Sequence, residues 1–171
     1  MSKRELKKYL TQLPKEALEE QIVALYEKFV PVKTYFDFVF NPKEELLVND
    51  AKMKISNEYF PVKRKRPKLR RSIAQKFIKH FMILGVDDFI IADLMFYAIE
   101  VAQKYSSKRN VVYESFFKSL LTAFDQAIKF IIEKGIHAEF ESRVNAIKQE
   151  VIRQDWSNKF EFINIADRLE Y

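Results

Sequence analysis

Apolar residues recur every three or four positions through most of the chain, which is the spacing of one face of an α-helix. Short stretches that contain proline, serine or charged residues separate these amphipathic segments. The sequence therefore predicts an all-α protein. The predicted helical segments run from Pro14 to Phe29, from Pro42 to Tyr59, from Ser72 to Leu84, from Asp87 to Ala102, from Tyr113 to Ile132, from Phe140 to Val151 and from Trp156 to Tyr171.

Residues with strong positional preferences mark the ends of several helices. Ser2 followed by Glu5 is a capping-box pattern and predicts a further short helix at residues 2–13. Gly85 predicts a left-handed helix end, and the acidic pair that follows it favours a new helix start. Gly135 is expected to close another helix.

The segment from Val32 to Phe40 fits two structures. Its β-branched and aromatic residues lie between Pro31 and Asn41-Pro42, and this composition suits a strand. A strand needs a partner, for which residues 160–165 are the candidate. The helical surroundings favour short helices at both places, and the two-stranded pairing remains the alternative.

Short connections between consecutive helices place them as antiparallel neighbours. We expect seven to nine helices in an irregular antiparallel bundle or a two-layer helical stack, because no repeat of 33 to 45 residues is recognisable. Residues 1–171 are expected to form one domain, with a proline-flanked basic connection at 61–71 as the internal boundary candidate. The apolar stripe from Tyr113 to Ile132 is assigned to burial in the same chain, and a seam with a second chain is the alternative.

Composition excludes several chemistries. Of the 171 residues, 48% are hydrophobic, which is enough for a core without a metal or disulfide. The absence of cysteine excludes disulfides, zinc–thiolate sites, Fe–S clusters and cysteine nucleophiles. Two glycines are too few for a P-loop or a G-x-G-x-x-G turn.

A metal site has little support. Glu133, His137 and Glu141 are spaced four residues apart, but Gly135 is expected to break the helix between them. One histidine with two carboxylates is also a sparse ligand set. We expect no metal and no cofactor.

Catalytic candidates are equally weak. Asp87 and Asp88 complement the start of a helix, and Asp93 is expected to face solvent. No serine lies in a nucleophile-elbow context, and only two histidines are present. We identify no catalytic residues and expect no enzymatic activity.

Positive charge is concentrated in one stretch. The net charge of the chain is +6. The basic stretch from Lys63 to Arg71 carries seven positive charges and no Asp or Glu, so the rest of the chain has a net charge of −1. Such a cluster indicates a local anionic partner, for example nucleic-acid phosphates, or else a solvated linker. The candidate anion-binding residues are Lys63, Arg64, Lys65, Arg66, Lys68, Arg70 and Arg71.

Neighbouring residues could extend this basic stretch. Ser72 would cap the following helix, and Lys76, Lys79 and His80 on that helix would extend the basic patch. Tyr59 and Phe60 would either stack on bases or, as we favour, anchor a helix end to the core.

Two functions from different classes remain. The first is a non-enzymatic interaction or adaptor protein that binds a protein partner or itself. The alternative is a non-specific nucleic-acid-binding accessory protein that uses residues 63–71, because no recognition helix or RNA-binding signature is present. No apolar run reaches the length of a membrane span, and the charged start is unlike a signal peptide, so we expect a cytoplasmic protein without membrane contact.

Four segments carry a resemblance to a known family. They are Met1–Leu25, Lys33–Pro42, Glu58-Tyr59-Phe60-Pro61 and Lys76–Phe81. Over most of residues 1–105 the sequence resembles an uncharacterised bacterial family classed as a domain of unknown function. The resemblance implies a small, helical, cytoplasmic protein and supplies no catalytic residues.

Overall fold

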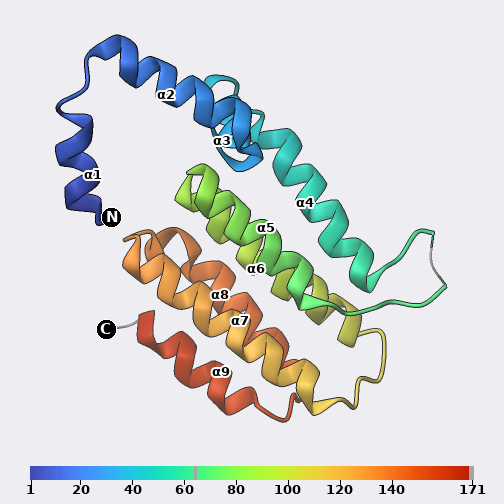
Figure 1. Ribbon diagram of the computed structural model, residues 1–171. Helices are drawn as coiled ribbons and strands as arrows, with labels where there is room; N and C mark the ends of the chain where they lie inside the picture. Colours follow the sequence, from blue (N-terminus) through green and yellow to red (C-terminus); the bar gives the residue numbers. More distant parts are fainter. Residues whose placement is uncertain (64, 170–171) are drawn as a thin grey trace. The chain divides into compact units, whose positions relative to one another are not determined.

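The computed structural model describes residues 1–63 and 65–169, and in these residues it is helical without any strand (Figure 1). This confirms the all-α prediction and the predicted number of helices. The helices are α1 (Lys3–Leu10), α2 (Lys15–Lys28), α3 (Val30–Phe40), α4 (Glu44–Tyr59), α5 (Arg71–Leu84), α6 (Asp88–Ser106), α7 (Glu114–Glu133), α8 (His137–Arg153), α9 (Lys159–Ala166) and the short 3₁₀ helix η1 (Asp167–Leu169).

Several predicted helix ends are confirmed. The capping box is formed, since the Ser2 hydroxyl accepts a hydrogen bond from the Glu5 amide and the Glu5 carboxylate accepts one from the Ser2 amide. Gly85 ends α5 with a φ of 73°, and Gly135 follows α7 with a φ of 69°. Both values lie in the left-handed region, which glycine adopts without a steric penalty.

The ambiguous segment is helical. Residues 32–40 lie in α3, and the proposed partner strand at residues 160–165 lies entirely within α9, so the strand alternative is wrong. Phe29 is the C-cap of α2 and the N-cap of α3, and Pro31 lies in the first turn of α3, where a helix needs no N–H donor. A β-rich composition therefore gives way to helix where no strand is available for pairing.

The chain divides into two compact units, Met1–Lys43 and Glu44–Tyr171. In the first unit α2 packs against α3, and none of the three helices has a buried residue. The basic connection at 61–71 lies inside the second unit, where it joins two helices that contact each other, α4 and α5.

Helix α6 is the centre of the second unit, because α4, α5, α7 and α8 all pack against it, while α9 packs on α7 and α8. The core contains four fully buried phenylalanines, Phe81, Phe96, Phe124 and Phe162. The inward residues of the α7 stripe are buried here as well, which confirms burial in the same chain for the middle of that stripe. None of the described helices has the length and apolarity needed to cross a membrane.

Candidate nucleic-acid interface

The basic stretch forms a loop that leaves the end of α4 and returns to it (Figure 1). The backbone carbonyl of Glu58, in the last turn of α4, accepts hydrogen bonds from the amides of Lys68 at 3.0 Å and Leu69 at 3.2 Å. Leu69 adopts a left-handed φ of 54°, which turns the chain into α5. These contacts fix the base of the loop at residues 61–70, while its basic side chains extend from it.

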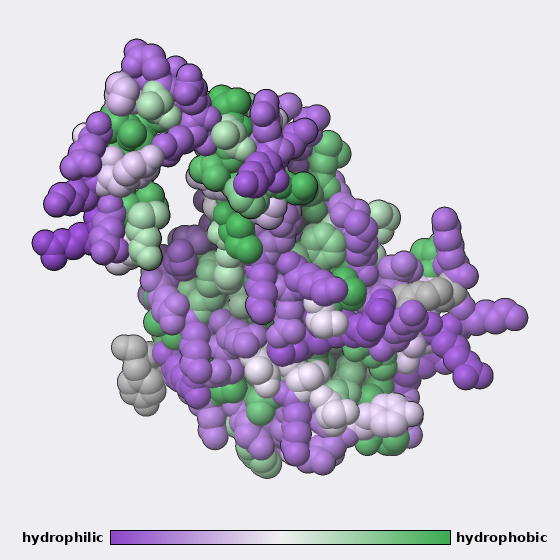
Figure 2. Space-filling view, in the orientation of Figure 1, coloured by the Kyte–Doolittle hydropathy of each residue, from purple (hydrophilic) through white to green (hydrophobic). Residues whose placement is uncertain are grey.

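Five of the predicted anion-binding residues are exposed on this loop: Arg70, which pairs with Glu58, and the four cations Lys63, Lys65, Arg66 and Lys68. None of these four forms an ion pair with another residue that the structure describes. Arg64 lies outside the described residues. Figure 2 shows hydrophilic side chains projecting around this loop, so its charges face solvent.

The two arginines at the end of the stretch have different surroundings. Arg70 makes two hydrogen bonds to the buried carboxylate of Glu58, at 2.8 and 3.0 Å, and these raise the pKa of Arg70. Arg71 is the first residue of α5, and burial lowers the pKa of its guanidinium. Its Nη1 atom is buried without a hydrogen-bond partner. Arg70 therefore anchors the loop, and Arg71 is partly buried at the start of α5.

The structure differs in two respects from the predicted extension of the basic stretch into the next helix. Arg70 is the N-cap of α5, so the expectation that Ser72 caps this helix is wrong. Lys76 and Lys79 are exposed on α5, but Lys79 lines a separate pocket with Met82 of α5 and Glu133 of α7.

A second cationic segment lies next to the loop in space. The sequence from Tyr59 to Val86 carries nine Lys or Arg residues and no acid, and the sequence from Val101 to Tyr113 carries three and no acid. The rings of Tyr59 and Phe60 each lie 5.9 Å from the ring of Tyr105 near the end of α6. These contacts bring the two acid-free segments together.

A pocket of about 500 Å³ lies where these segments meet. Its lining residues are Ser56, Phe60, Tyr97, Glu100, Val101, Lys104 and Lys108. Tyr59 is buried, as predicted for a helix anchor, and burial raises its pKa to about 12. Phe60, in contrast, is partly exposed and contributes its ring to the pocket.

Glu100, the one acid among the residues that line the pocket, is neutralised by an ion pair with α8. Arg143 of α8 binds the Glu100 carboxylate through Nε and through Nη2 at 2.9 Å, and its Nη1 lies 2.6 Å from Asp93. Lys104 and Lys108 are exposed, and neither forms an ion pair within residues 1–63 and 65–169. The pocket therefore has a surplus of positive charge.

Asp93 belongs to this same cluster, and the expectation that it faces solvent is wrong. Its carboxylate is half-buried between Arg143 and Lys52, whose Nζ lies 2.6 Å away. Burial raises the pKa of Asp93, but the hydrogen bonds and charges of Lys52 and Arg143 outweigh burial and lower the pKa below its usual value. Ion pairing explains why an aspartate is tolerated on the central helix.

The remaining candidates do not converge. Glu133 ends α7 and His137 begins α8, so Gly135 separates them onto two helices as predicted. Among the described residues, no group of three or more His, Cys, Asp or Glu side chains could hold a metal ion. Asp87 caps α6 by accepting a hydrogen bond from the Phe89 amide at 2.8 Å.

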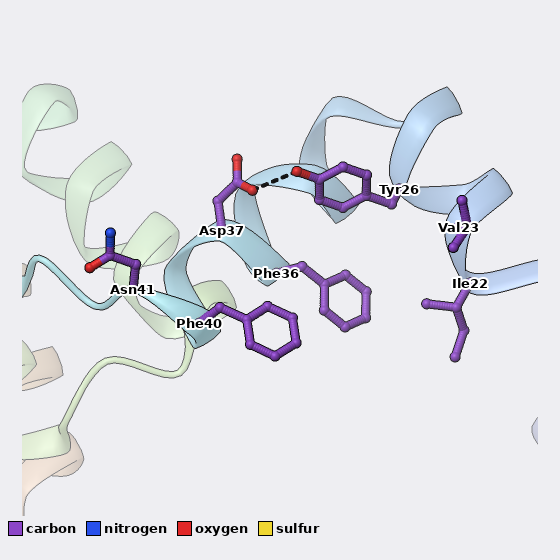
Figure 3. A pocket seen from close by; sticks show the side chains of 7 residues that line it. All are labelled: Ile22, Val23, Tyr26, Phe36, Asp37, Phe40 and Asn41. Atoms are coloured by element: carbon purple, nitrogen blue, oxygen red, sulfur yellow. Dashed lines mark hydrogen bonds between the residues drawn. The ribbon is translucent and has the colours of Figure 1, made fainter. Parts of the chain in front are cut away.

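The first unit carries a different kind of surface. A pocket of about 600 Å³ between α2 and α3 is lined by Ile22, Val23, Tyr26, Phe36, Asp37, Phe40 and Asn41 (Figure 3). The Tyr26 hydroxyl donates a hydrogen bond to Asp37 at 2.7 Å, which links the two helices. Phe40 is 81% exposed and Val30 is 76% exposed. Apolar side chains are therefore available for contact here.

Comparison with known proteins identifies one family. No curated protein matches the chain, and no solved structure matches it. The model of a family of unknown function, DUF6155, matches residues 1–170, which extends the resemblance seen in the first 105 residues to almost the whole chain. The chain therefore belongs to the DUF6155 family.

Proposed function

We propose that this protein binds the phosphate backbone of nucleic acid. The binding residues are the cations of the basic loop and of the adjoining end of α6. The observation that carries the proposal is the meeting of two acid-free, cationic segments at one end of the second unit. Lysine and arginine side chains that neutralise phosphates release condensed counterions, which favours binding at low salt. The cations of the loop are exposed to solvent, and hydrogen bonds to Glu58 hold the base of the loop in place. Both features suit phosphate binding.

The proposed binding is independent of base sequence and does not involve catalysis. The exposed cations lie on an irregular loop rather than on a helix that could enter a groove, and phosphate contacts carry no sequence information. A cytoplasmic location is part of the proposal, and the absence of cysteine fits a reducing compartment.

The test is binding of a labelled oligonucleotide of about 20 nucleotides, followed by fluorescence anisotropy over a range of salt concentrations. Replacing Lys63, Lys65, Arg66 and Lys68 together by serine removes four phosphate contacts. We expect the slope of log K against log salt to fall in magnitude by about 3, with most of the affinity lost at low salt. Arg70 is retained in this variant because it holds Glu58.

A charge-matched variant provides the control. Replacing Lys15, Lys28, Lys118 and Lys134 by serine removes the same charge from α2, from α7 and from the residue that follows α7. This variant should keep most of the affinity if the loop is the binding site. Equal losses in the two variants would show that only net charge matters, and absence of wild-type binding at low salt would exclude the proposal.

A second candidate function is protein–protein interaction through α2 and α3. The exposed apolar residues around the pocket in Figure 3 support it, because isolated helical units of this size seldom bury enough apolar surface alone. A second copy of the chain is the occupant to test first. Replacing Val30 and Phe40 by serine should abolish concentration-dependent self-association in sedimentation experiments, and a wild-type protein that stays monomeric would contradict self-association.

A further inference from the structure

We infer that the pocket between the ends of α4 and α6 accepts an unstacked base, so that the preferred ligand is single-stranded nucleic acid. This inference rests on the proposed function and specifies its ligand. The sequence named Phe60 as a residue that could stack on bases, but it did not reveal the pocket, because the other lining residues come from α4, α6 and the turn after α6.

The pocket combines the two features that single-strand binding requires, a ring for stacking and cations for phosphate. Phe60 is partly exposed in the pocket wall, and Tyr97 lines the same pocket. Lys104 and Lys108 line the same space, and Arg143 neutralises Glu100 there. A volume of about 500 Å³ is in the range of ligand-binding pockets.

The loop cations lie a short distance along the chain from this pocket. Lys63 lies three positions after Phe60, which is a chain length of at most about 11 Å. The amide of Lys68 is hydrogen-bonded to the carbonyl of Glu58, one turn or less from Phe60. A strand with one base at Phe60 therefore has loop cations within reach of its neighbouring phosphates.

A duplex fits this arrangement less well. Its bases are stacked and paired inside the helix, so a ring set in a concave pocket cannot reach a base face without extrusion. A single strand can turn a base outward at little cost, and any base offers a π-face. The site is therefore expected to prefer single strands without a strong sequence preference.

The experiment compares three ligands of about 20 nucleotides by anisotropy: oligo-dT, a duplex, and an oligonucleotide of abasic sites with the same backbone charge. We expect wild-type protein to bind oligo-dT about tenfold more tightly than the abasic strand. Phe60→Leu should remove this difference and leave abasic binding unchanged, whereas Phe60→Tyr should retain it. Emission of the single tryptophan, Trp156, which is buried in the second unit, monitors folding of each variant.

Two further variants separate the pocket from general effects. Phe160→Ala removes an aromatic side chain that is 66% exposed on α9, and it should leave all affinities unchanged. Replacing Lys104 and Lys108 by alanine should reduce the salt slope for oligo-dT by about 1.4, whereas the same change at Lys118 and Lys134 should not.

The outcomes distinguish this inference from the proposed function. Equal wild-type affinity for oligo-dT and the abasic strand, or an equal effect of Phe60→Leu on both, would overturn the base pocket while leaving phosphate binding intact. Equal or tighter binding of the duplex would overturn the single-strand preference. Absence of binding to all three ligands would remove the proposed function as well.

Discussion

Arg143 shows how a single side chain can organise charge around the central helix. Its guanidinium contacts the carboxylates of both Asp93 and Glu100 and lies 5.7 Å from the centre of the Phe96 ring. Lys52 reaches Asp93 from α4, so the cluster joins three helices. Partly buried charges of this kind stabilise a fold only while each has its partner, because an unpaired charge retains its desolvation cost.

Replacement of Arg143 by methionine tests this arrangement. Methionine keeps much of the apolar stem but removes the charge, which leaves Glu100 without its partner and Asp93 with Lys52 alone. We expect a loss of about 2 kcal/mol in the free energy of unfolding, below the ~3–5 kcal/mol typical of fully buried pairs, because the side chains of Arg143 and Glu100 are 24% and 37% exposed. Urea denaturation followed by circular dichroism measures the loss.

The control is Arg153→Met. Arg153 pairs with Glu150 three residues earlier on α8, but its side chain is 65% exposed, so we expect no measurable change in stability. Equal effects of the two substitutions would contradict a special role for the Arg143 cluster.

Helices in this chain follow local signals even where composition points elsewhere. Helix α3 forms from a segment rich in β-branched and aromatic residues, and a proline in its first turn favours its start there. Helix α5 ends at a glycine in the left-handed conformation. A helix end of this type depends on the backbone conformation of the glycine. A substitution at the glycine therefore tests it without disturbing the core.

Gly85→Ala should lower the free energy of unfolding by about 1 kcal/mol, because alanine is strained at a φ of 73°. A Cβ atom at this position would meet no heavy atom within 4 Å, so the loss comes from backbone conformation alone. Thermal and urea unfolding measure it. Gly135→Ala, at a φ of 69° and also free of steric contact, should cost about the same amount, and no loss at either position would refute the explanation.

At the scale of the whole molecule, the two units differ in how they are stabilised. The second unit has a core of buried phenylalanine, isoleucine and leucine side chains around α6. The first unit has no buried residue in its helices. Because apolar burial is the main favourable term in folding, the two units should differ in their resistance to local opening.

Native-state hydrogen exchange of the full-length protein should show this difference. We expect amides in the middle of α6 and α7 to exchange slowest, through global unfolding, and amides of α1, α2 and α3 to exchange much faster, through local opening. Exchange measured by mass spectrometry on peptides from both units would decide the matter. Protection of α2 and α3 equal to that of α6 would show that their apolar face is covered in solution.

Much of the architecture was predictable because helix formation depends on neighbours in sequence. The apolar period, the capping box at Ser2 and the two left-handed glycines located most helices, and the missing cysteines excluded whole classes of site. The apolar period of α2 was less informative about burial, since Ile22 and Leu25 remain about half exposed. An amphipathic pattern predicts a helix, but it does not specify what covers its apolar face.

The cationic residues show most clearly which features were evident from the sequence and which depended on packing. Their accumulation near residues 63–71 was evident from the order of amino acids alone, and so was the absence of nearby acids. Only the tertiary structure shows that Glu58 at the end of α4 holds Arg70 at the start of α5, whereas the other loop cations face solvent. Likewise, only packing of α4 against α6 places Phe60 and Lys104 in the wall of one pocket. Local interactions determine where helices form, whereas contacts between distant residues depend on how those helices pack, and the candidate site consists of such contacts.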